Sequence, residues 1–104
     1  MSNYTEKEAI RWEYLQQLQK EGKIKFLRRQ AKYILIPLQI EYVDKKMKTV
    51  EEECVYIADF AYDDAKGNLH VEDIKEYTND GDYKVFEIKR KLMRWIHKIV
   101  VEQV

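Results

Sequence analysis

The 104-residue chain has one cysteine, two histidines and no long hydrophobic run. Cys54 cannot form a disulfide within the chain, and one cysteine with two distant histidines lacks the ligand spacing of a zinc site. No apolar segment approaches the roughly 20 residues that a transmembrane helix needs, and no charged-then-apolar leader opens the chain. We therefore expect a protein that has no membrane partner and is cytoplasmic.

Glycine and proline are also scarce, with three and one in the chain, which argues against a loop-rich or disordered protein. The length fits a single domain over residues 1–104. The formal net charge is zero, which counts against indiscriminate nucleic-acid binding because phosphate contacts require lysine and arginine. A run of five cations between Lys23 and Lys32 favours a solvated strand face over a contact with the DNA backbone.

Local patterns predict the order helix, strands, helix, strand, which is an α/β (α+β) fold with a mostly antiparallel mixed sheet. Thr5 and Glu8 fit a capping box for a helix that ends near Glu21, and Ile10 and Tyr14 belong to its apolar arc. We expect strands at 31–36, 38–43, 49–63, 69–77 and 99–101. The second predicted helix covers 83–97, with Asp82 as its N-cap.

Two carboxylates are predicted to lie side by side in a hairpin. Residues 65–67 fit a three-residue loop with Gly67 in the left-handed position. Continuing this register pairs Tyr62 with His70, Phe60 with Glu72, and Asp59 with Asp73. Opposed residues have Cβ atoms roughly 4.5 to 5.5 Å apart, so two ionised aspartates are costly there unless a divalent cation lies between them.

Two lysines are candidates for the same site. Strand alternation places Lys75 on the face of Asp73, where a lysine can orient the attacking water beside a metal ion. Mg²⁺ suits one or two carboxylates, with Mn²⁺ as an alternative. Lys89 lies in the middle of the apolar face of helix 83–97, and burying an unpaired ammonium is expensive. We expect Lys89 to face the carboxylates, and the alternative is that it extends along the core to solvent.

Asp59 followed by Asp73-Ile74-Lys75 resembles the Asp...(Asp/Glu)-X-Lys signature of the PD-(D/E)XK nuclease superfamily. The surrounding segments are similar to a phage-encoded family of small Holliday-junction-resolvase-like endonucleases. The likeness runs from about Glu6 to the C-terminus. The segments that carry it are Lys7-Glu8-Ala9, 56–60, 71–75 and Phe86-X-X-Lys89-X-Lys91-Leu92.

This resemblance implies a restriction-endonuclease-like core and a metal-dependent endonuclease that hydrolyses DNA phosphodiesters. The implied substrate is branched or structured DNA in phage replication or recombination, in the host bacterial cytoplasm. A resolvase cuts two strands symmetrically, which implies a homodimer. The sequence does not identify its interface, for which Trp95 and the outer edge strand are the candidates. The implied metal ligands are Asp59, Asp73, the backbone carbonyl of Ile74 and Glu8, with Lys75 at the water and Lys89 on the scissile phosphate.

Several alternatives stay open at this point. Glu8 fits the reciprocal cap of the first helix as well as it fits a metal site. A one-residue bulge would bring Glu72 to the metal in place of Asp73. The zero net charge and Glu76 beside Lys75 favour a non-catalytic nucleic-acid-binding or protein-interaction module on the same fold. An unrelated α/β domain is the third interpretation.

Overall fold

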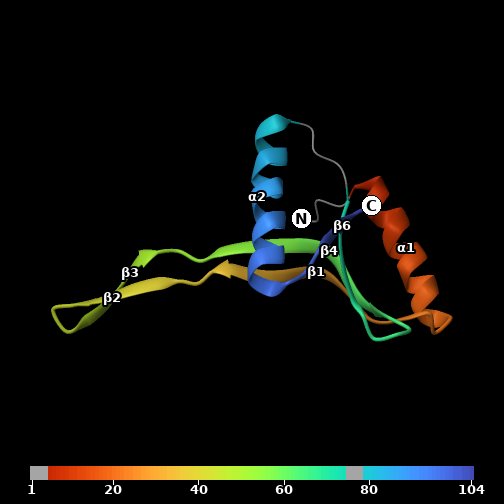
Figure 1. The fold of residues 1–104 in the computed structure, drawn as a ribbon, viewed down its shortest axis with the longest axis horizontal. Coiled ribbons are helices and arrows are strands. Elements are labelled where there is room, and N and C mark those ends of the chain that lie inside the picture. Colours follow the sequence, from red (N-terminus) through yellow and green to blue (C-terminus); the bar gives the residue numbers. More distant parts are fainter. Residues whose placement is uncertain (1–4, 75–78) are drawn as a thin grey trace.

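The computed structural model describes residues 5–74 and 79–104 of the chain. A four-stranded sheet in the order β1-β4-β5-β6 is antiparallel except between β5 and β6, which run parallel. This arrangement confirms the predicted α+β class (Figure 1). The elements are α1 (Glu6–Lys20), β1 (Ile24–Ile36), β2 (Gln39–Val43), β3 (Lys46–Glu51), β4 (Cys54–Asp64), β5 (Leu69–Asp73), α2 (Asp80–His97) and β6 (Val101–Gln103).

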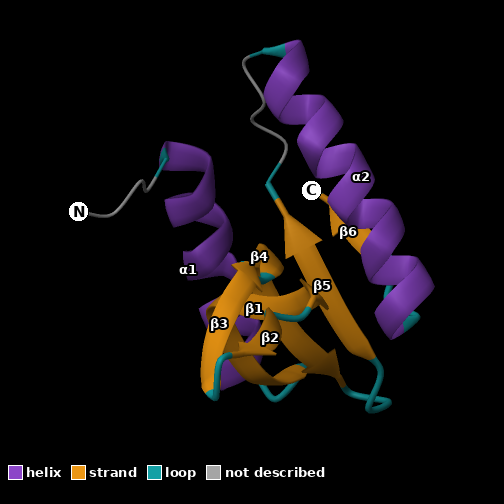
Figure 2. Cartoon of the chain, turned by 90° about the vertical axis from the view of Figure 1, so that its left-hand side faces the viewer, coloured by secondary structure: helices purple, strands orange, loops and turns teal. Residues whose placement is uncertain are grey.

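The two helices cover opposite faces of the four-stranded sheet (Figure 2). On one face Leu15 of α1 packs with Phe60 of β4 and Ile74, all buried. On the other face Phe86 and Met93 of α2 pack in a separate core cluster. Its remaining buried members are Leu35, Tyr56, Ala58, Ala61, Val71 and Val101. A sheet covered on both sides explains why its central strands are rich in apolar residues. Neither helix, over the residues that the structure describes, is long and apolar enough to cross a membrane.

The first helix is capped as its sequence predicts. Thr5 Oγ1 accepts a hydrogen bond from the backbone N–H of Glu8 at 3.2 Å, and Gly22 follows the C-terminus with φ +75°. The predicted apolar arc is partly wrong, because Ile10 and Tyr14 are 62% and 52% exposed. The predicted arc also holds Trp12, Leu15 and Leu18, which do pack against the sheet, so the buried stripe is narrower than the residue types indicate.

The β4–β5 hairpin has the predicted register. Phe60 pairs with Glu72 and Tyr62 pairs with His70. Gly67 has φ +85°, and its N–H donates to the carbonyl of Asp64, which closes the three-residue loop. The turn chemistry therefore fixes which side chains of the two strands lie next to each other.

Several predicted boundaries are corrected by the structure. The predicted strand 31–36 begins earlier, at Ile24, and the predicted strand 49–63 is divided between β3 and β4. The second helix begins at Asp80, because Asn79 rather than Asp82 is its N-cap and accepts from the Asp82 N–H at 2.8 Å. The last strand is 101–103 rather than 99–101, and most of the end of the predicted strand 69–77 lies outside the described residues.

Strands β2 and β3 form a separate two-stranded ribbon, which we call the arm (residues 39–51). Figure 1 shows the arm extending away from the helices and the four-stranded sheet. The radius of gyration is 16.7 Å, whereas roughly 13 Å is typical of a compact domain of this length. Every residue of both arm strands is exposed.

A buried ion pair joins α1 to β5. Glu72 is 1% exposed and accepts two hydrogen bonds from Arg11, at 2.9 Å from Nε and 2.6 Å from Nη2. The Tyr62 hydroxyl donates a third. The Glu72 carboxylate raises the pKa of Arg11 above its usual value, because its hydrogen bonds and its charge favour the guanidinium ion.

Replacing Arg11 with methionine is expected to destabilise the fold by about 3 kcal/mol, because it leaves the Glu72 carboxylate buried without its cation. Chemical denaturation measures this loss. Arg28→Met, at an exposed arginine of β1, is the matched control and should change the unfolding free energy little. The double variant Arg11→Met/Glu72→Leu should recover much of the loss. A double variant as unstable as Arg11→Met would show that the unpaired charge is not the cause.

Candidate active site

Three acidic side chains from three elements converge at the end of β5 where the strand meets α1. Asp59 lies on β4, Asp73 is the last residue of β5, and Glu8 lies in the first turn of α1. The carboxyl group of Asp59 is hydrogen-bonded to that of Asp73 and lies within electrostatic range of Glu8. Asp59 Oδ2 also accepts the backbone N–H of Ile74 at 2.7 Å. The structure therefore brings together four of the predicted residues.

Asp73 is the most buried of these acids. It is 5% exposed, and its Oδ1 accepts a hydrogen bond from the Tyr56 hydroxyl at 3.1 Å. Asp59 is half-buried beside it. Burial of this kind leaves little water to solvate a second negative charge beside the first.

Burial raises the pKa of Asp59 to about 7, and the negative charges of Asp73 and Glu8 raise it in the same direction. The hydrogen bond from Ile74 N–H lowers the pKa but does not offset these effects. Near neutral pH the pair therefore shares a proton that an exposed aspartate would have lost. A divalent cation between the carboxylates would replace that proton.

Glu72 lies on the other face of β5 from Asp73. Its carboxylate is held by Arg11 and Tyr62 on the α1 side, whereas Asp73 contacts Asp59 and Tyr56. The alternative in which Glu72 replaces Asp73 at the site is therefore wrong, because β5 follows the alternation without a bulge at this point.

Asp73 and Lys89 line one cleft of about 290 Å³ between β4 and α2. Lys89 is half-buried, and Asp82 lines the same cleft from the first turn of α2. The other lining residues are Val55, Tyr56, Ile57, Val85 and Phe86. The prediction that Lys89 faces the side of the carboxylates thus has a structural basis. Lys75 lies outside the described residues.

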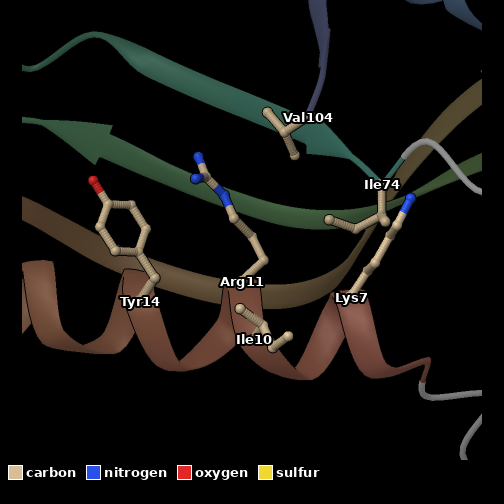
Figure 3. Close-up of a pocket in the computed structure, with 6 residues that line it drawn as sticks. All are labelled: Lys7, Ile10, Arg11, Tyr14, Ile74 and Val104. Carbon is tan, nitrogen blue, oxygen red and sulfur yellow. The ribbon is translucent and has the colours of Figure 1, made fainter.

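A second groove of about 480 Å³ runs on the α1 side of the same strand end (Figure 3). Lys7, Ile10, Arg11 and Tyr14 of α1 line it together with Ile74 and Val104. Figure 3 shows Lys7 extending from the start of α1 toward Ile74, whose backbone N–H binds Asp59. Lys7 is adjacent to Glu8 in the chain, yet no role for its charge is predicted from the residue pattern. Its position next to a residue predicted for the site was the available signal.

The left-handed backbone conformation of Gln30 in β1 is a further feature that the residue pattern did not reveal. Its φ is +51°, a left-handed conformation that is uncommon for residues other than glycine. Its neighbours Arg29 and Ala31 pair with Phe60 and Ala58, so Gln30 lies beside Asp59. Backbone strain of this kind costs on the order of 1–3 kcal/mol and is frequent at functional sites.

The donors present fit a hard cation such as Mg²⁺. Two adjacent carboxylates, with water and substrate phosphate completing the shell, are a common arrangement for this ion. Within residues 5–74 and 79–104, no three histidine, cysteine, aspartate or glutamate side chains are grouped closely enough to hold a metal by themselves. The charge of Glu8 raises the pKa of Asp59, and the backbone N–H of Glu8 donates to Thr5 in the cap of α1.

Comparison with protein families identifies one match, which covers residues 3–102 and carries the description "Protein of unknown function (DUF1064)". The chain belongs to the DUF1064 family. Neither the curated proteins nor the solved structures compared with the chain gave a match. The family description assigns no function to this DUF1064 chain. A function can therefore be inferred only from the geometry of the site and from the resemblance of its motifs to PD-(D/E)XK nucleases.

Asp59→Asn is expected to stabilise the metal-free DUF1064 chain at pH 8. Asparagine keeps an acceptor for Ile74 N–H and gains a donor toward Asp73, while it removes a buried negative charge. The folded state holds its proton up to about pH 7, whereas the unfolded state releases it near the ordinary pKa of 3.8, so the carboxyl costs stability as pH rises. Because Asp59 is only half-buried, we expect a gain of about 1–2 kcal/mol at pH 8.

Urea denaturation of the wild type and Asp59→Asn at pH 5 and pH 8, both with chelator, measures this gain. The difference between the two proteins should be larger at pH 8. Equal stability at both values of pH would mean that Asp59 ionises normally.

Proposed function

We propose that this chain is a metal-dependent endonuclease that hydrolyses DNA phosphodiester bonds. The observation that carries the proposal is the contact between half-buried Asp59 and buried Asp73, in which the pKa of Asp59 is raised to about 7. An arrangement that holds two carboxylates together with a shared proton is unfavourable for stability and suits a cation site. The resemblance of the motifs to those of PD-(D/E)XK nucleases supports the same function.

In the proposed site, Asp59 and Asp73 hold Mg²⁺ or Mn²⁺ together with the backbone carbonyl of Ile74, and Glu8 contributes directly or through water. When bound, the cation supplies charge stabilisation at the phosphate and lowers the pKa of a water molecule. Ile74 N–H keeps one oxygen of Asp59 oriented. The Tyr56 hydroxyl does the same for Asp73 Oδ1.

Lysines on both sides of the carboxylates suit a phosphate. Lys89 reaches the cleft from α2, and Lys7 borders the groove on the α1 side. We assign Lys89 to the scissile phosphate, where an ammonium stabilises charge that develops as the bond breaks. In this proposal Lys75, two residues after Asp73, orients the attacking water.

The basic surfaces differ in what remains available for DNA. On β1, Lys32 pairs with Glu53 at 2.9 Å and Arg29 lies over the ring of Trp12, so part of the Lys23–Lys32 run serves the fold. Lys91, Arg94 and Trp95 of α2 line one surface hollow together with Lys98, whose Nζ lies 5.0 Å from the centroid of the exposed Trp95 ring. This combination of cations and an aromatic ring suits contacts with a nucleic-acid backbone and an unstacked base. The substrate class we propose, branched or structured DNA in phage replication or recombination, rests on the motif resemblance.

Cleavage of a labelled four-way junction and of a linear duplex tests the proposal directly. We expect cutting with Mg²⁺ or Mn²⁺, none with chelator, and a loss of at least about 100-fold in Asp73→Asn, because the metal loses a charged ligand. Asp44→Asn at the tip of the arm is the matched control, since asparagine tolerates the φ of +51° there. It should cut at the wild-type rate.

Lys89→Met should lower the cleavage rate about 10- to 1000-fold while DNA binding changes less, because the ammonium acts mainly as the bond breaks. Binding without cutting by folded wild type, under every metal, would favour the non-catalytic nucleic-acid-binding module. Cutting that is unaffected in Asp73→Asn would contradict the assigned site.

Mg²⁺ is expected to raise the melting temperature of the wild type by roughly 5 °C when present at about ten times its dissociation constant. The increase should be larger at pH 8 than at pH 6, because below pH 7 the proton on Asp59 competes with the cation. Thermal unfolding of Asp59→Asn should show little response. An identical response of the two proteins would place the cation elsewhere.

A further inference from the structure

The arm is a two-stranded ribbon with one apolar face. Residues directly opposite each other in an antiparallel pair share a face, so Tyr42 and Met47 lie on the same side, as do Ile40 and Thr49. Alternation along β2 puts both pairs on one face. Tyr42 is 72% exposed, Met47 66% and Ile40 46%. Adjacent large apolar side chains with this exposure are typical of a surface that another protein covers.

The arm also lacks the support that a ribbon of this kind needs. An isolated two-stranded hairpin is marginally stable in water, and additional strands or a packed layer usually stabilise it. Both arm strands are fully exposed, and each pairs only with the other in the described sheet. Their outer edges therefore present unpaired backbone groups.

Charge is divided along the length of the arm. At or near its tip the cations Lys45, Lys46 and Lys48 outnumber the single acid Asp44, whereas Glu51, Glu52 and Glu53 lie at its root. Glu53 pairs with Lys32 of β1, which leaves Glu51 and Glu52 as the outer acidic residues of the root. Two arms lying antiparallel would bring the basic tip of each to the acidic root of the other. A parallel arrangement would oppose like charges.

We propose that the arm is the contact through which two copies of this chain form a two-fold dimer, with the arms antiparallel. The contact covers the Ile40, Tyr42 and Met47 face and pairs the tip of each arm with the root of its partner. A two-fold interface must complement itself, and opposite charges at the two ends of one ribbon meet that requirement. The proposal depends on the arm alone and holds whether or not the chain cuts DNA.

Sedimentation equilibrium of the full chain measures this association. Wild type should be a dimer, and Tyr42→Glu should weaken the dimer at least about tenfold, because it places a charge in the apolar contact. Trp95→Glu on α2 is the matched control and should remain dimeric. A monomeric wild type at about 100 µM would overturn the proposal, as would a dimer lost in Trp95→Glu and kept in Tyr42→Glu.

Charge reversal tests the antiparallel order without changing the apolar face. The tip variant Lys45→Glu/Lys46→Glu and the root variant Glu51→Lys/Glu52→Lys avoid the Lys32–Glu53 pair and the cross-strand pair of Glu41 and Lys48. Each variant alone repels its own copy at both ends and should be monomeric. An equimolar mixture should form heterodimers, because the acidic tip of the first variant then meets the basic root of the second, and the acidic root of the first meets the basic tip of the second. Monomers in the mixture, or dimers of either variant alone, would overturn the antiparallel contact.

Discussion

Two adjacent acidic residues on one strand are the constraint on which this structure depends. Because side chains alternate along β5, Glu72 and Asp73 are buried on opposite faces. Arg11 neutralises Glu72 through two hydrogen bonds and thereby attaches α1 to the sheet. Asp73 instead contacts a second acid, Asp59, on the strand beside it. One acid therefore stabilises the fold, while the other creates a local excess of negative charge at the end of the sheet.

The elements around β5 are arranged so that the acidic pair of Asp59 and Asp73 can be approached from two sides. The cleft under α2 contains Lys89, and the groove along α1 contains Lys7, so one lysine lies on each side of the end of β5. Ile74 links the two regions, since its backbone binds Asp59 and its side chain lines the groove. The fold thus places both helices at the acidic pair.

Much of the fold and part of the candidate site could be predicted from the sequence because local rules determine them. The loop ending at Gly67 sets the hairpin register, and that register places Asp59 near Asp73. Arg11 as the partner of Glu72 could not be predicted, since 61 residues separate them and only the packing of α1 on the sheet brings them together. The left-handed Gln30 and the projecting arm depend likewise on strand pairing, which residue types specify only weakly.

Asp59 and Asp73 share a hydrogen bond between their carboxyl groups, and burial raises the pKa of Asp59 to about 7. Carbon-13 NMR titration of the aspartate carboxyl groups, with Asp59→Asn and Asp73→Asn for assignment, measures this property directly. Without divalent cations the pair should show an apparent pKa near 7, and Mg²⁺ should lower it. Aspartates that all titrate near the ordinary value of about 4, with no change on adding Mg²⁺, would contradict the account.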